Sequence, residues 1–306
     1  MQILKLETNR EQPDSVNGSK PAPPPSAVGD LTPNETAQRL IEWSAAKSAL
    51  SLDRLIILGV MAGVFVAFGG AFFTGVMTEL PLTHGPSRLL GGIAFSAGLL
   101  FVCVTGAELS MGNCMIVAAW ATRRLTFKDV SRNLLISYIA NVAGALLVAL
   151  IIARSGLLDS GHGQVAAAVA ESKMQLGYEQ AFLRGILCNT LVCTGVWAIL
   201  AGRTISSKLL GLLFPISAFI TLGFENSIAN IYLLPIGLLA GAQGSLATAA
   251  LNIVFVTLGN LVGGAVVAVA FWMAHLRVDN KAHTTPVSAR PFRLFNAKLQ
   301  PSASRA

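Results

Sequence analysis

The sequence carries little charge. Only 12% of its 306 residues are Asp, Glu, Lys or Arg, while 53% are hydrophobic; a typical soluble domain has about 25% charged residues. The mean hydropathy of +0.63 therefore indicates a polytopic membrane protein and argues against a soluble core. The net charge of +7 would suit nucleic acid, but the basic residues gather in the two tails and two short loops, as membrane topology produces. We expect no nucleic-acid partner.

Catalytic and metal-binding motifs are also missing. The four cysteines lie in apolar segments and none forms a CxxC pair, so we expect buried thiols and no metal or disulfide. No metal-spaced His/Cys cluster, nucleophile elbow or phosphate loop occurs. We therefore expect no cofactor and no enzyme activity.

Four regions follow one another along the chain. Residues 1–34 are polar, rich in Pro, Ser and Gly, and contain no apolar core of the signal-peptide type, which predicts a disordered cytoplasmic tail. Residues 35–52 have the apolar spacing of an amphipathic helix that lies on the membrane surface or against its own bundle. A six-span domain at 53–276 and a basic cytoplasmic tail at 277–306 complete the chain.

Long apolar segments predict an all-α protein with six transmembrane helices, since one crossing needs about 20 apolar residues. The segments run approximately from 55–78, 89–121, 134–153, 180–201, 208–241 and 250–275. The second and fifth are too long for one straight crossing, so each is expected to be two half-helices joined by a break. The distribution of Lys and Arg places both termini on the cytoplasmic side.

The two long segments contain related octapeptides. "GAELSMGN" at 106–113 and "GFENSIAN" at 223–230 share Gly, Glu, Ser and Asn at the same offsets, 117 residues apart. "IANVAGALL" at 139–147 similarly resembles "LGNLVGGAV" at 258–266, 119 residues apart. A three-span repeat places its second copy upside down in the membrane. Inverted repeats with breaks at matching positions indicate a substrate pathway near the midplane.

Polar residues at these breaks admit two interpretations. A break frees backbone groups that lipid cannot satisfy, and in the first interpretation the side chains serve solely to cap the half-helix and bond these amides. In the second interpretation they are functional, as ionisable residues within a membrane often are. The break residues are Glu108, Ser110, Met111 and Asn113 in the first half, and Glu225, Asn226, Ser227 and Asn230 in the second. The half-helix N-termini favour a small anion or a polar neutral solute, provided that both glutamates bond to backbone and neighbouring amides away from the pore axis.

Four segments carry a resemblance to a known family. "GGIAFSAGLLFVCVTGAEL", "RGILCNTLVCTGVWA", "GFENSIANIYLLPIG" and "TLGNLVGG" resemble the signature segments of the formate/nitrite transporter family, in order, from about residue 35 to 275. The resemblance implies an aquaporin-like protomer in a bacterial cytoplasmic membrane, assembled as a homopentamer. Each subunit would hold a pore for small monovalent weak-acid anions such as formate or nitrite, with or without a co-transported proton.

The resemblance also implies roles for particular residues. Apolar constrictions match Phe95, Leu99, Leu109 and Phe219, for which ordinary core packing is the alternative. Lys173, expected in the loop before the fourth span, matches a lysine that draws anions into the vestibule; a solvated loop charge is the alternative. Asn189 and Asn260 match polar residues of the central chamber, and Glu225 matches its acidic neighbour.

Two departures from the family pattern leave the substrate open. Asn226 stands where the family usually has histidine, and the four histidines of the chain are expected in loops or tails. Ser110 and Met111 replace an aromatic residue and a hydroxyl. An aquaporin-like channel for small neutral solutes is the alternative function, although no Asn-Pro-Ala motif occurs. A non-transporting scaffold would not need matched helix breaks.

Overall fold

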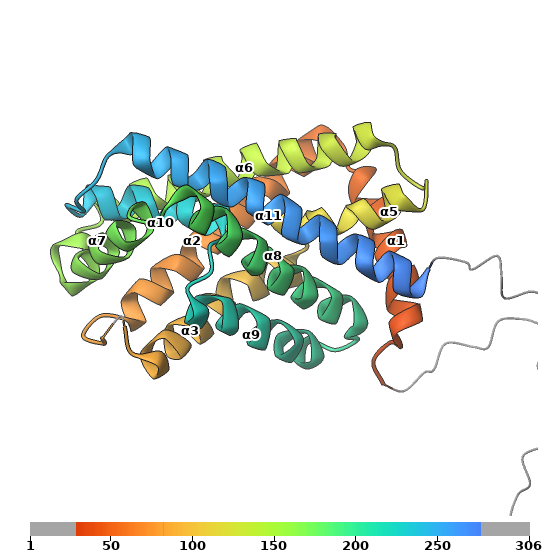
Figure 1. Cartoon of the computed structure of the whole chain (residues 1–306), viewed down its shortest axis with the longest axis horizontal. Coiled ribbons are helices and arrows are strands. Elements are labelled where there is room, and N and C mark those ends of the chain that lie inside the picture. Colours follow the sequence, from red (N-terminus) through yellow and green to blue (C-terminus); the bar gives the residue numbers. More distant parts are fainter. Residues whose placement is uncertain (1–28, 82, 277–306) are drawn as a thin grey trace, which may run out of the picture.

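The computed structural model describes residues 29–81 and 83–276. Most of the predicted N-terminal tail (1–34) and all of the C-terminal tail (277–306) lie outside the described residues. The described chain is helical, and in Figure 1 α11 runs along the bundle while α7 lies at its left end. The elements in chain order are α1 (Pro33–Ser48), α2 (Leu52–Val76), α3 (Gly85–Thr105), α4 (Ser110–Asn113), the 3-10 turn η1 (Cys114–Ile116), α5 (Val117–Ala121), α6 (Phe127–Arg154), the 3-10 turn η2 (Leu157–Asp159), α7 (Gly161–Met174), α8 (Tyr178–Ala201), α9 (Ile205–Leu222), α10 (Ser227–Leu239) and α11 (Leu246–His275).

Six of the described helices are long and apolar enough to cross a membrane: α2, α3, α6, α8, α9 and α11. Their outer faces expose large apolar side chains such as Leu135, Ile139 and Phe214, which suits contact with lipid. The prediction of an all-helical, six-span membrane protein is therefore confirmed.

Glycine produces both helix breaks. α3 ends at Gly106 (φ 73°) and α9 ends at Gly223 (φ 70°), in the left-handed region that residues with a Cβ rarely adopt. The chain then restarts as a helix at Ser110 in the first half and at Ser227 in the second. The prediction that spans two and five are broken is confirmed.

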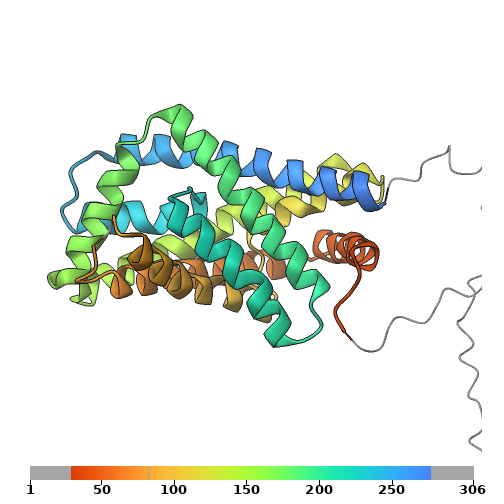
Figure 2. The ribbon, with the colours of Figure 1, turned by 60° about the horizontal axis from the view of Figure 1, so that its bottom comes forward.

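The two halves point in opposite directions. α1 precedes the first three spans and α7 precedes the last three, and Figures 1 and 2 place these short helices at opposite ends of the bundle. α1 buries Thr36, Ala37, Leu40, Ile41 and Ser44 against the protein itself. The repeat therefore consists of a short helix followed by three spans.

Small residues bring matching helix pairs close together. A Cβ on Gly144 of α6 would lie 2.1 Å from the Val60 carbonyl oxygen of α2, and one on Gly263 of α11 would lie 2.2 Å from the Ile186 carbonyl oxygen of α8. Lipid supplies no hydrophobic drive between helices, so close backbone packing of this kind stabilises their association. The half-helices that follow the breaks, α4 and α10, each contact helices of both pairs, α2–α6 and α8–α11.

Candidate functional site

An asparagine from the third span holds the first helix break together. The Asn141 Oδ1 atom accepts a hydrogen bond from the Ser110 N–H group at 2.9 Å. Its Nδ2 atom donates to the Glu108 carbonyl at 2.9 Å and to the Gly59 carbonyl at 2.7 Å. One buried side chain thus satisfies three backbone groups on two other segments, which a break inside a membrane requires.

The second break is held in the same way. The Asn260 Oδ1 atom accepts from the Ser227 N–H group at 2.9 Å, and its Nδ2 atom donates to the carbonyls of Glu225 (2.9 Å) and Gly185 (2.8 Å). Both amide protons of Asn260 and one lone pair of its Oδ1 atom are thus bonded to backbone groups. Asn260, predicted to face the central chamber, therefore has its amide protons bound to the scaffold.

The first glutamate lies in a buried polar cluster. Glu108 accepts from the Lys47 ammonium at 2.6 Å and from the Asn113 amide at 2.7 Å. Asn113 also donates to Asn133 at 2.8 Å, and Asn133 donates to the Lys47 carbonyl at 3.2 Å. The cluster closes on itself and joins α1, the break, α4 and α6.

The second glutamate has the same set of partners. Glu225 accepts from the Lys173 ammonium through both carboxylate oxygens, at 2.8 and 2.9 Å, and from the Asn230 amide at 2.6 Å. Asn230 donates to Asn252 at 2.8 Å, and Asn252 donates to the Lys173 carbonyl at 2.9 Å. Both carboxylates are thus neutralised by lysines in nearly dry surroundings, so an anion passing nearby meets no net negative charge.

The structure corrects the prediction for Lys173 and adds residues that sequence reasoning missed. Lys173 lies in helix α7 and is ion-paired with Glu225, whereas a loop position and a free charge were expected. The helix was missed because segment 161–174 is shorter than the apolar segments by which the spans were recognised. The missed members of the two clusters are Lys47, Asn133, Asn141 and Asn252. A signal was available, since the asparagine pairs Asn133/Asn252 and Asn141/Asn260 are each 119 residues apart, the offset of the second sequence repeat.

Two cavities open toward the breaks from opposite ends. We call the first the α1 vestibule, a cavity of about 90 Å³ whose lining includes Trp43, Lys47, Leu99, Val102, Leu109 and Leu212. We call the second the α7 vestibule, a cavity of about 320 Å³ whose lining includes Phe73, Arg88, Lys173, Arg184, Glu225 and Leu233. Each lysine of a buried cluster therefore also lines one vestibule.

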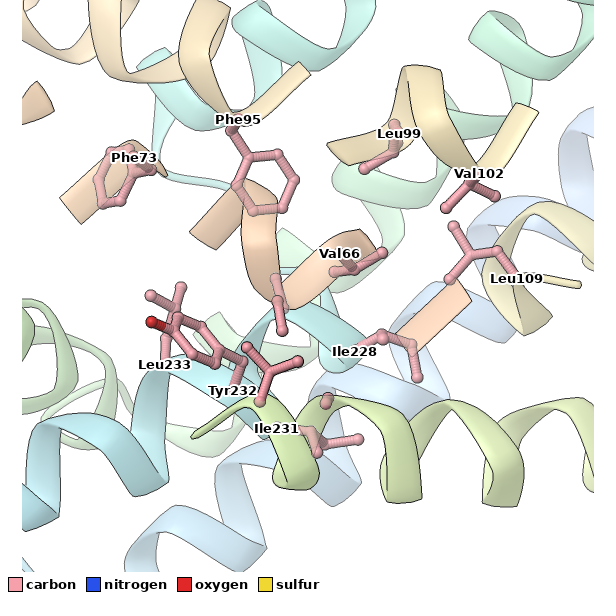
Figure 3. Packing of buried hydrophobic residues seen from close by; sticks show 14 of the residues in the cluster. Val66, Phe73, Phe95, Leu99, Val102, Leu109, Ile228, Ile231, Tyr232 and Leu233 are labelled. Atoms are coloured by element: carbon pink, nitrogen blue, oxygen red, sulfur yellow. The ribbon is translucent and has the colours of Figure 1, made fainter. Parts of the chain in front are cut away.

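Apolar side chains close the space between the two vestibules. The rings of Phe95 and Phe219 meet edge to face with their centroids 5.7 Å apart, and both are buried. Leu99 and Leu109 lie on the α1 side, and Figure 3 shows Val102 and Leu109 pointing toward one another. The structure thus brings the four predicted constriction residues into one apolar cluster, in two layers: the phenylalanine pair and the leucines that line the α1 vestibule.

Two asparagines near this cluster keep unused hydrogen-bonding groups. The Asn226 Oδ1 atom caps α10 by accepting from the Ala229 N–H group at 3.1 Å, and its amide group neighbours the buried Cys188 thiol, which is a weak hydrogen-bond acceptor. Asn189 donates to the carbonyls of Met111 (3.2 Å) and Asn260 (2.7 Å), while its buried Oδ1 atom has no hydrogen-bond partner within residues 29–81 and 83–276. Asn226 can therefore donate to a passing solute, and Asn189 can accept from one.

The hydroxyl groups that follow the two breaks show the same symmetry. The Oγ atoms of Ser110 and Ser227 are buried and have no hydrogen-bond partner among the described residues. A buried hydroxyl without a partner costs free energy, so both positions suit transient contact with water or a polar solute.

Comparison with known proteins gives the same picture. The model of the family described as formate/nitrite transporter matches residues 34–274. A probable formate transporter of Methanothermobacter thermautotrophicus is 33% identical over 267 residues, covering 80% of this chain and 97% of that protein. The formate channel FocA of Escherichia coli K12 is 32% identical over 277 residues, covering 83% of this chain and 97% of that protein.

The chain belongs to the formate/nitrite transporter family. A solved structure described as a pentameric formate channel with formate bound superimposes with a TM-score of 0.66 at 31% identity, covering 74% of this chain and 98% of that one. The family prediction made from the four signature segments is confirmed.

Histidine placement in this family member needs a correction. His162 lies within α7, is buried, and its Nε2 atom is 2.7 Å from the Thr74 Oγ1 atom; His275 is the last residue of α11. The expectation that all histidines lie in loops or tails is wrong for these two, and His283 lies outside the described residues. None of the three described histidines lies at a helix break, so none takes the place of the histidine that Asn226 replaces.

Burial lowers the pKa of His162 below its ordinary value, so the folded transporter favours the neutral ring. The neutral His162 ring therefore adds to the folding stability at pH values above the ordinary pKa of histidine. This contribution is lost as the pH falls from that value toward the lowered pKa.

In residues 29–81 and 83–276, no group of three His, Cys, Asp or Glu side chains could hold a metal ion.

Asn260→Ala is expected to destabilise the assembled transporter by about 2–4 kcal/mol. The change leaves one backbone N–H group and two carbonyls unpaired in buried surroundings, at about 1–3 kcal/mol for each group in water and less in a membrane. The measurement is the thermal midpoint of the purified protein. Thr194→Ala is the control, because that hydroxyl is exposed and bonds within its own helix. Equal midpoints for Asn260→Ala and the parent would contradict the assignment.

Proposed function

We propose that this protein is a channel-like transporter of small monovalent weak-acid anions, with formate the first candidate and nitrite the second. The observation that carries the proposal is the pair of vestibules, each lined by an ion-paired lysine, on either side of a buried apolar constriction. The family, and the relatives described as formate channels, support this substrate class. The solved pentameric relative supports a homopentamer in which each subunit holds its own pore.

The orientation follows from the basic residues. Short loops and ends rich in Lys and Arg gather on the side of α1, which the positive-inside tendency places in the cytoplasm. We therefore propose that the α1 vestibule opens to the cytoplasm, that both termini are cytoplasmic, and that the α7 vestibule opens outward. The proposed location is the cytoplasmic membrane of a bacterium.

The constriction determines which form of the substrate crosses most easily. A bare anion loses its hydration in a narrow apolar passage at a large free-energy cost, whereas the neutral acid loses far less. The amide protons of Asn226 and the half-helix amides offset part of this cost for an anion. Two routes follow: passage of the neutral acid, which carries no current, and passage of the bare anion, which does.

Flux into liposomes tests the proposal. We expect the reconstituted protein to carry formate and nitrite faster than acetate, and to carry glycerol no faster than protein-free liposomes. Hydrosulfide extends the series to an anion without oxygen. Rapid glycerol flux without formate flux would support the aquaporin-like alternative and overturn the proposal.

Phe219→Ala and Leu99→Ala are expected to raise formate flux several-fold and to admit larger monocarboxylates such as acetate. Each change removes a buried side chain from the apolar constriction and so widens it. Large-to-small changes in a core also destabilise, by about 2–5 kcal/mol, so flux is measured per amount of assembled protein. Ile152→Ala, in the same core but away from both vestibules, is the control. If both variants keep the parent's flux and selectivity, these side chains serve packing alone.

A further inference from the structure

Two arginines converge at the second helix break. Beside Gly223, the Arg88 Nη2 atom lies 2.7 Å, and the Arg184 Nη1 atom 3.8 Å, from the point where a Cβ would stand. Arg184 also donates to the Gly223 carbonyl at 3.3 Å. Arg88 comes from α3 and Arg184 from α8, so two separate spans bring their guanidinium groups to one backbone position.

These two cations have no carboxylate partner in the described part of the chain. The Glu225 carboxylate, which lines the same vestibule, is already bound by Lys173 and Asn230. Both arginines are half-buried and line the α7 vestibule. Two like charges held this close repel one another, and an anion placed between them relieves that repulsion.

The two vestibules differ in charge as a result. The α7 vestibule is lined by Arg88, Lys173, Arg184 and Glu225, which leaves a net charge of +2. The charge of Lys47 in the α1 vestibule is balanced by Glu108. The excess positive charge of the pathway is therefore at the α7 end, and the arginines, not Lys173, supply it.

We propose that Arg88 and Arg184 form an anion-binding site at the mouth of the α7 vestibule, which takes a small planar oxyanion such as a carboxylate before it reaches the constriction. A guanidinium group presents a planar fork of N–H donors that matches two carboxylate oxygens. The assignment of this oxyanion as substrate rests on the proposed function, whereas the binding site itself does not.

Arginine-specific modification by phenylglyoxal tests the site without any transport. Modification of the purified protein is located by mass spectrometry, with sodium formate, sodium acetate or sodium chloride added at one ionic strength. We expect formate and acetate to slow modification of Arg88 and Arg184 by about fivefold or more, with a smaller effect of chloride. Arg154, exposed at the end of α6, is the internal control and should react at one rate in all three salts. Equal protection by chloride would reduce the site to general screening and overturn the proposal.

Lipid phosphate is the other source of an oxyanion, so the modification is repeated in vesicles of zwitterionic lipid and of anionic lipid. Protection by formate in zwitterionic vesicles supports a site for small anions. Protection that comes from anionic lipid alone, and that added formate does not change, would assign the arginines to a lipid headgroup and overturn the proposal.

Flux measurements then connect the site with transport. Arg88→Gln/Arg184→Gln is expected to raise the KM for formate entering from the α7 side about tenfold at low salt, since a local positive field raises anion concentration by 10-fold or more. The maximal rate should stay near the parent's, and Arg154→Gln should behave as the parent. Arginine protection in a protein that carries no formate would contradict the proposed function but keep the site. Normal formate flux without arginine protection would contradict the binding site but keep the proposed function.

Discussion

Lys173→Gln is expected to lower the equilibrium constant for forming the folded, assembled transporter by about two to three and a half orders of magnitude. The change leaves the Glu225 carboxylate, whose side chain is 4% exposed, without its cation. Removing one partner of a buried ion pair costs about 3–5 kcal/mol, and each 1.4 kcal/mol is a factor of ten in an equilibrium constant. The orphaned carboxylate must stay charged in dry surroundings or take up a proton. Pentamer recovery in detergent and the thermal midpoint are the measurements.

A second substitution separates this effect from simple loss of charge. Lys173→Gln/Glu225→Gln replaces the ion pair by two neutral amides that can still bond to each other and to Asn230, so we expect it to recover most of the stability. Lys47→Gln, alone and with Glu108→Gln, is the matched pair in the other half and should show the same pattern.

The alternative role of Lys173, as a free charge in the α7 vestibule, predicts a different result for the same variant. If Lys173 served only to gather anions, Lys173→Gln would fold normally and lose flux at low salt, and the loss would shrink as salt screens the field, over about 10 Å at 0.1 M. Normal assembly combined with this salt dependence would contradict the structural role of the ion pair.

The breaks were predictable because their chemistry is local. The octapeptides place the left-handed glycine, the glutamate and the asparagine of each break within eight residues of one another. The Glu108–Asn113 and Glu225–Asn230 contacts lie within that window. Local sequence therefore contained the positions of both breaks and half of each polar cluster.

The lysine partners were not predictable in this way. Lys47 lies 61 residues from Glu108 and Lys173 lies 52 residues from Glu225, so no local pattern joins them. α7 is too short for a span, so the sequence predicts its residues in the loop before the fourth span. Its equivalence to α1 becomes visible only when the two ends of the bundle are compared.

Long-range packing also decides which apolar residues form the constriction. Phe95 and Phe219 come from different halves and meet because α3 and α9 lie side by side. The repeat does not pair them with each other, since the offset of 117 relates Phe95 to Leu212 and Phe219 to Val102. The constriction therefore has aromatic rings toward the α7 vestibule and aliphatic side chains toward the α1 vestibule, an asymmetry that the family resemblance alone did not contain.

Asn226→His is expected to add a new limb to the pH dependence of transport, on the order of tenfold in flux between about pH 7 and pH 5. An unperturbed histidine titrates near 6.5, whereas asparagine does not titrate. In the parent, the pH dependence should therefore follow protonation of the substrate itself, with no step assignable to position 226.

The cap made by Asn226 sharpens this expectation. Its Oδ1 atom accepts from the Ala229 N–H group, so a neutral histidine can keep the cap with one ring nitrogen and donate to the anion with the other. A protonated histidine has no acceptor left. It loses the cap and places a positive charge at the positive end of the α10 dipole. Protonation is then favoured mainly when an anion is present to balance it, which links the new limb to the substrate.

Flux and current distinguish the possible outcomes when they are measured in liposomes across pH for the parent, Asn226→His and Asn226→Gln. The glutamine variant keeps an amide and cannot titrate, so its profile should match the parent's. Neutral-acid passage gives flux without current, and bare-anion passage gives both. A histidine that transfers its proton to the anion should lower the current carried per formate below pH 6.5 while the flux rises. If the profile of Asn226→His matches that of Asn226→Gln in both flux and current, position 226 does not control proton handling. The constriction and the substrate's own acidity would then set the pH dependence.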